Sequence, residues 1–171
     1  MQAPPGPHAD ELRLVVDDVR SSMVGCDAAS LTVVRGEEAV MVVGTSALGR
    51  RLEEAQWAAG HGPGIDALRQ LQVFNVASLA SARAWPAFTE LALGQGVRST
   101  LAVPVTAGGR ALGVLNLYSA DVDAFSGREP IALRYASDAA SMLAGGEWTA
   151  VVRRPGPGGT TDPPAVVPAA T

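Results

Sequence analysis

Residues 97–120, VRSTLAVPVTAGGRALGVLNLYSA, decide the fold of this chain. Two β-rich apolar runs, residues 99–106 and 111–119, flank the connection Ala107-Gly108-Gly109-Arg110. A short, glycine-containing connection between two such runs predicts a β-hairpin. Both runs are apolar at successive positions, which is typical of strands covered on both faces. The sequence therefore predicts a layered fold around this hairpin, with an irregularity at Pro104 because proline cannot donate to a strand ladder.

Length, charge and cysteine content narrow the class of protein. The 171 residues suffice for one domain with tails, and a hydrophobic fraction of 47% supports a packed core. The formal net charge of −4 argues against a nucleic-acid partner. The single cysteine, Cys26, excludes an intrachain disulfide and is expected to be a small buried hydrophobe rather than a reactive thiol. We expect a cytoplasmic protein, because neither a membrane helix nor a signal peptide is evident.

The folded part of the chain is bounded by its prolines, most of which lie near the two ends. We predict a disordered N-terminus at residues 1–8, a folded domain at residues 9–149 and a disordered Pro/Gly-rich tail at residues 150–171.

Periodicity within the folded part predicts helices and short strands in alternation. The predicted helices span residues 10–23, 47–59, 65–70, 86–93 and 126–143, and the strands outside the hairpin span residues 29–35, 39–43 and 72–79. In the helix at 47–59, Leu48, Leu52 and Ala55 are expected to face the core. This order predicts an α+β fold with a mostly antiparallel sheet of five or six strands. The terminal helices would cover one face, and short helices and loops the other.

Several segments, in their order and spacing, together resemble a known family. They are Leu48-Gly49-Arg50-Arg51-Leu52-Glu53-Glu54, Gly62-Pro63, Asp66-Ala67-Leu68, Trp85-Pro86-Ala87-Phe88, Gly96-Val97-Arg98-Ser99, Leu101-Ala102-Val103-Pro104-Val105 and Leu112-Gly113-Val114-Leu115-Asn116-Leu117-Tyr118. Over residues 9–145 the chain resembles a GAF domain, a small-molecule sensor module related in architecture to PAS domains. The resemblance is greatest to actinobacterial GAF domains that are often joined to ANTAR RNA-binding output domains.

The chain also departs from its apparent relatives. Gly60-His61-Gly62-Pro63-Gly64 stands where they commonly have Gly-Glu-Gly-Pro-Cys, and the motif of cyclic-nucleotide-binding GAF domains is largely missing. GAF-type methionine sulfoxide reductases need several cysteines, whereas this chain has one. We therefore expect that the protein is not an enzyme, and that a separate protein supplies any signalling output.

Polar residues that interrupt the apolar strands are the first candidates for a binding site. Strand alternation puts Arg98 with Thr100 on one face and Asn116 with Tyr118 on one face. If the two faces coincide, they form a polar patch that could orient a small ligand inside an apolar cup. Arg98 would favour an anionic or carbonyl-bearing ligand. Alternatively, Arg98 and Tyr118 are strand-end residues that reach solvent.

Aromatic and loop residues complete the candidate site. Trp85 and Phe88 could form apolar walls of a pocket or pin their helix onto the sheet. His61 could border the mouth of the pocket and titrate there, or be an exposed loop residue. His8 is the only other histidine, so no multi-histidine metal site is expected.

These observations predict a non-catalytic, small-molecule-binding sensor domain of GAF type. The apolar stripes of its terminal helices predict a homodimer. The ligand is unidentified, and no cofactor is indicated. The alternative is a GAF-like interaction or dimerisation module with a filled core and no ligand.

Overall fold

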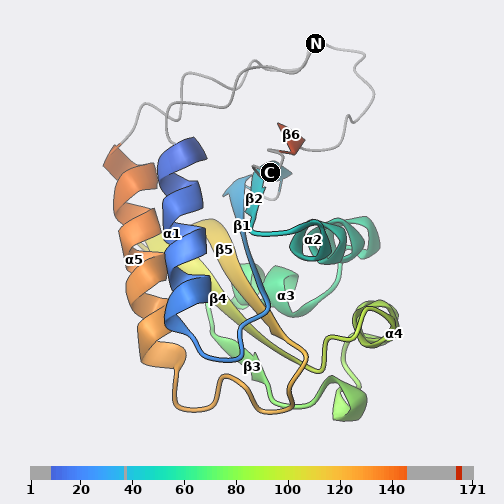
Figure 1. Cartoon of the computed structure of the whole chain (residues 1–171). Coiled ribbons are helices and arrows are strands. Elements are labelled where there is room, and N and C mark those ends of the chain that lie inside the picture. Colours follow the sequence, from blue (N-terminus) through green and yellow to red (C-terminus); the bar gives the residue numbers. More distant parts are fainter. Residues whose placement is uncertain (1–8, 37, 146–164, 167–171) are drawn as a thin grey trace, which may run out of the picture.

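The computed structural model describes residues 9–36, 38–145 and 165–166 of the chain. Figure 1 shows a central sheet with helices on both faces. The strands are β1 (Ala28–Arg35), β2 (Glu38–Gly44), β3 (Phe74–Val76), β4 (Ser99–Ala107), β5 (Arg110–Ser119) and β6 (Ala165–Val166). The helices are α1 (Ala9–Ser22), α2 (Ala47–Ala59), α3 (Pro63–Gln70), α4 (Pro86–Gly94) and α5 (Glu129–Gly145), with a 3-10 turn at Leu79–Ser81. The predicted α+β fold is confirmed.

The hairpin of β4 and β5 forms as predicted. Ala107 pairs with Arg110, so Gly108 and Gly109 alone make the turn. Their φ angles of 57° and 73° are those that a type I′ turn requires at both central positions. The strand order is β3-β4-β5-β1-β2-β6, which puts β5 in the interior of the sheet. An irregularity was expected at Pro104, which pairs with Val114 in regular register; the shift lies one residue further on, between Val105 and Thr106.

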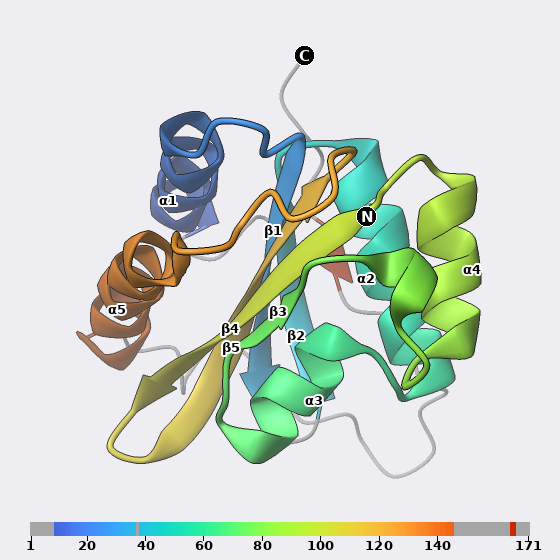
Figure 2. The same ribbon diagram turned by 90° about the horizontal axis from the view of Figure 1, so that it is seen from below.

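One face of the sheet is covered by the two terminal helices, which lie side by side (Figures 1 and 2). α1 buries a stripe that includes Leu12, Val16 and Val19, as its sequence period requires. α5 buries mainly alanines, including Ala132 and Ala136. Small side chains let α5 approach the sheet closely. The leucines and valines of β1, β4 and β5 that face α1 and α5 complete this larger core.

The other face is covered by α2, α3 and α4 (Figure 2). Ser46 caps the start of α2 by accepting a hydrogen bond from the Gly49 N–H, and Gly60 ends the helix in the left-handed conformation. The core under these helices is smaller and more aromatic, with Trp85, Phe88 and Tyr118 buried in it. None of the described helices is both long and apolar enough to cross a membrane.

The inner face of α2 differs from the prediction. The helix buries Gly49, Leu52, Glu53 and Gln56, whereas Leu48 and Ala55 are only partly buried. The prediction of an apolar inner face at Leu48, Leu52 and Ala55 was therefore wrong in part. The reason lies in the sheet beneath, whose polar side chains need polar partners from the helix.

Two predicted boundaries also shift. The strand predicted at residues 72–79 is limited to β3, because the chain then turns into the 3-10 segment. The last helix begins at Glu129 rather than at Ser126, whose hydroxyl bonds the Asp123 carboxylate. Pro130 lies in the first turn of α5, where a missing backbone N–H costs nothing.

The predicted disordered segments lie almost entirely outside the described residues. Of residues 150–171, the structure describes Ala165 and Val166, which pair with β2 in parallel as β6. For these two residues it differs from the prediction, and disorder elsewhere in the tail stays a prediction.

Candidate functional site

The polar residues of the hairpin share one face, as strand alternation predicted. In the register of the sheet, Asn116 on β5 pairs with Ser30 on β1 and with Ala102 on β4. Two residues further along β5, Tyr118 pairs with Thr100 on β4. Thr100, Asn116 and Tyr118 have no exposed surface. They lie beneath the helices α2–α4, on the face away from α1 and α5.

The carboxylate of Glu53 occupies the centre of this face. Its Oε1 accepts hydrogen bonds from Ser30 Oγ at 2.6 Å, from Asn116 Nδ2 at 2.7 Å and from Tyr118 Oη at 2.7 Å. Its Oε2 accepts a bond from Thr32 Oγ1 at 2.9 Å. All four donors are neutral groups on β1 and β5. Glu53 therefore ties α2 to the two strands at the middle of the sheet.

Gln56 extends the network toward α3. Its Nε2 donates to Tyr118 Oη at 3.2 Å, and its Oε1 accepts from the Gly64 N–H at 2.7 Å. A Cβ at position 64 would lie only 2.7 Å from Asn116 Nδ2. Glycine is needed here because the start of α3 packs directly on the network.

Burial dominates the electrostatics of the network. Loss of hydration raises the pKa of the Glu53 carboxyl group above its ordinary value, and its four hydrogen bonds oppose this shift only partly. Burial and the nearby charge of Glu53 raise the pKa of Tyr118 well above its usual range. Tyr118 therefore stays protonated and remains a hydrogen-bond donor.

Trp85 and Phe88 lie beside the network and pack tightly. Trp85 is 6% exposed, and its Nε1 donates to Asp66 Oδ2 at 2.8 Å. Its ring meets Phe74 edge to face, with ring centroids 5.8 Å apart. These contacts hold the start of α4 against α3 and β3.

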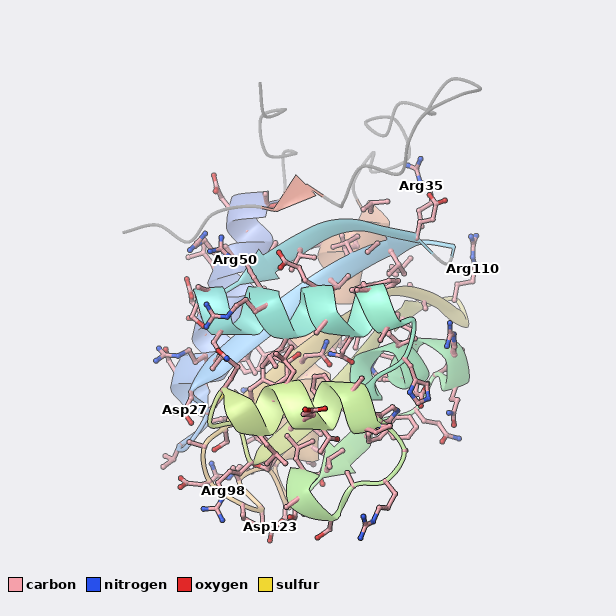
Figure 3. The ribbon with its side chains drawn as sticks, turned by 90° about the vertical axis from the view of Figure 1, so that its right-hand side faces the viewer. Asp27, Arg35, Arg50, Arg98, Arg110 and Asp123 are labelled. Carbon is pink, nitrogen blue, oxygen red and sulfur yellow. The ribbon has the colours of Figure 1, made fainter. Side chains whose placement is uncertain are left out.

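The other two predicted site residues lie apart from the network. His61 is exposed on the loop between α2 and α3. Arg98 is exposed directly before β4, and Figure 3 shows it near Asp123, at the opposite end of the molecule from Arg110. Arg98 thus matches the alternative of a strand-end residue that reaches solvent, whereas Tyr118 does not.

A cavity of about 450 Å³ lies on the same side of the sheet, at the end where the two hairpins turn. It is partly open and is lined by the last turn of α2, by α3 and by the hairpin ends of β1 and β5. Val34, Ile65 and Leu68 give it apolar walls, and Trp57 and Arg69 add polar groups. None of the seven predicted site residues lines it. The seven are His61, Trp85, Phe88, Arg98, Thr100, Asn116 and Tyr118.

The sequence reasoning missed Glu53, Gln56, Trp57 and Arg69. A signal for the first two was present, since Gly49, Leu52, Glu53 and Gln56 follow the spacing i, i+3, i+4, i+7 of a buried helical stripe. Apolar periodicity does not detect this stripe, because two of its four residues, Glu53 and Gln56, are polar.

Comparison with known proteins identifies the family. The family model described as "GAF domain" matches residues 8–143, so the chain belongs to the GAF domain family. A comparison with curated proteins finds no match.

Solved structures share the fold at low sequence identity. A domain of a two-component sensor histidine kinase protein from Sinorhizobium meliloti 1021 is 19% identical, covers 81% of this chain and 92% of its own, and has a TM-score of 0.63. The type II free methionine-R-sulfoxide reductase from Thermoplasma acidophilum is 17% identical, with coverages of 80% and 92% and a TM-score of 0.61. A red/green cyanobacteriochrome in its red-light-absorbing state is 17% identical, with coverages of 85% and 99% and a TM-score of 0.59.

The expectation that the protein is not an enzyme was wrong. The reductase from Thermoplasma acidophilum has this fold over 92% of its length, so the fold also serves enzymes. Membership of the family therefore does not exclude catalysis. The greater likeness to actinobacterial GAF domains stays a prediction.

Proposed function

We propose that this chain is a ligand-sensing regulatory domain that passes its ligand state to a partner through its terminal helices. The observation that carries the proposal is the cavity beneath α2 and α3, which adjoins a helix tied to the central strands by Glu53. Its volume of about 450 Å³ lies in the range of small-molecule sites, about 300–1,000 Å³.

The network offers a physical route from the cavity to the far face of the sheet. Trp57 lines the cavity and lies one helical turn after Glu53. A ligand that displaces this end of α2 would change the hydrogen bonds of Glu53 to Ser30 and Thr32. Between these two residues Leu31 points to the opposite core, under α1 and α5. A movement of β1 would therefore be felt both under α2 and in the core under α1 and α5.

The ligand itself can be sought by native mass spectrometry of the freshly purified full chain, followed by a thermal-shift screen. Leu68→Trp fills the cavity, and Leu91→Trp places the same ring on the exposed side of α4 as a control. We expect the wild type and the Leu91→Trp variant to bind a hit equally, and the Leu68→Trp variant to lose it. A hit that binds all three proteins equally would contradict the proposed cavity. A screen without hits would favour the interaction module with a filled core.

The proposed partner at the terminal helices is a second copy of this chain. A groove of about 720 Å³ runs between α1 and α5, and Leu14, one of the residues that line it, is 65% exposed. Val15 and Met142 give the groove an apolar floor, and Glu11, Asp18 and Asp138 also line it. An exposed leucine beside such a groove suits a two-fold interface, in which each copy supplies both.

Light scattering tests this assembly directly. The wild type should give the mass of a dimer, and Leu14→Glu that of a monomer. Leu93→Glu, on the exposed side of α4, serves as the control and should remain dimeric. A monomeric wild type at high concentration would refute the interface.

A further inference from the structure

Trp57, one of the residues that line the cavity at the hairpin end, has an unsatisfied polar atom. Trp57 Nε1 is buried, and no described residue accepts a hydrogen bond from it. A buried donor without an acceptor destabilises the folded protein. The indole group can only donate, so the missing partner must be an acceptor.

The charge beside this donor is positive. Arg69 is the only charged residue among the described residues that line the cavity. Its Nη1 donates to the Gly60 carbonyl at 3.0 Å, which fixes the guanidinium group at the end of α2. A guanidinium group has five N–H donors, so this bond leaves others for a ligand.

The surroundings of the cavity add to the positive charge. Arg35 lies between the lining residues Val34 and Gly36, and Arg110 directly precedes Ala111, which also lines the cavity. Figure 3 shows Arg35 and Arg110 at the same end of the sheet, beyond the last turn of α2. Glu38 stands opposite Arg35 in the strand register. With Arg69, these segments of the sequence hold three arginines against Glu37 and Glu38, a surplus of one positive charge that favours anions.

We propose that this cavity binds an apolar carboxylate, a compound with a ring or short hydrocarbon body and one carboxylate group. The body packs between Val34, Ile65 and Leu68. The Arg69 guanidinium group pairs with the carboxylate. Because Trp57 Nε1 has almost no exposed surface without a ligand, the indole turns toward the cavity on binding and then donates to the same carboxylate. The inference rests on the proposed ligand-sensing function and adds the chemical class of the ligand.

The test uses the indole N–H resonance of Trp57 in ¹H–¹⁵N NMR spectra of the full chain, assigned by its loss in Trp57→Phe. The probes are 2-naphthoate and its neutral isostere naphthalene-2-carboxamide. Both place an acceptor beside the ring, and only the first carries a charge. A charge-assisted hydrogen bond is worth about 1.5–3 kcal/mol, so naphthoate should bind at least about tenfold more tightly.

Two variants distinguish the contribution of the Arg69 charge to binding from that of the apolar cavity walls. Arg69→Gln should weaken naphthoate binding by about tenfold and leave binding of the amide unchanged. Arg98→Gln, the matched change of an exposed arginine far from the cavity, should alter neither. Equal binding of both probes, or an Arg69→Gln variant that binds naphthoate normally, would overturn the carboxylate class and leave the ligand-sensing function standing. Failure of both probes to move the Trp57 resonance would overturn this site for such compounds, whereas the mass-spectrometric screen decides the proposed function separately.

Discussion

Replacing Glu53 tests the central network most directly. In Glu53→Ala the donors on Ser30, Thr32, Asn116 and Tyr118 lose their shared acceptor. The two hydroxyl groups on β1 can rotate toward other acceptors, but the Asn116 amide and the Tyr118 hydroxyl are held by their buried side chains. Each unsatisfied buried donor costs about 1–3 kcal/mol, so we expect a loss of about 2–6 kcal/mol in the free energy of unfolding. That is a large share of the 5–15 kcal/mol typical of a domain.

Glu53→Gln keeps the shape of the side chain and removes its ionisation. Because burial raises the pKa of Glu53 in the folded protein, the folded state holds this proton more tightly than the unfolded chain does. As pH rises above the ordinary value of 4.5, the unfolded chain loses the proton first, and the wild type loses stability relative to Glu53→Gln. One group contributes a slope of at most about 1.4 kcal/mol per pH unit.

Urea unfolding between pH 4.5 and pH 8, followed by circular dichroism, measures both effects. The stability of the wild type minus that of Glu53→Gln should fall as pH rises, and Glu53→Ala should be the least stable protein throughout. A pH-independent difference, or one that grows with pH, would show that the four hydrogen bonds outweigh burial. An Ala variant as stable as the wild type would refute the network as a stabilising element.

Three further predictions concern other parts of the chain. Gly64→Ala should lower the free energy of unfolding by about 1–3 kcal/mol in urea titrations, because its Cβ would press on Asn116, whereas Gly94→Ala has open space and should be neutral or slightly stabilising. Burial raises the pKa of the Cys26 thiol to about 11, so a disulfide reagent at pH 8 should modify it slowly in the folded protein and rapidly in urea; equal rates would contradict its burial. Truncation after Arg154 removes β6 and should lower the thermal midpoint by less than about 5 °C; a larger fall would show that the tail stabilises the domain.

The sequence predicted the sheet and its two covers because these depend on repeated apolar spacing. The glycine pair of the central hairpin and the stripe of Leu12, Val16 and Val19 recur in the structure as expected. Thr100, Asn116 and Tyr118 could also be placed on a common face, since alternation along a strand depends only on residue number.

The centre of the site could not be predicted in the same way. Glu53 is buried because four donors from other elements converge on it, and such convergence exists only after folding. The same holds for Trp57 and Arg69, which are adjacent to the cavity through the path of α2 into α3. Arg98 was misplaced for a simpler reason, because strand alternation was extended one residue beyond the start of β4.

Pro104 has a consequence for the behaviour of the protein in crowded solution. β3 pairs only with Thr100, Leu101 and Ala102, so β4 continues past the end of its outer neighbour. An exposed stretch of strand is a template on which a second chain can add and begin an aggregate. Here a strand added beyond β3 would meet a residue with no backbone N–H and then the register shift between Val105 and Thr106. Pro104 thus removes one backbone donor from this stretch of β4, which makes the stretch a poorer template for an added strand.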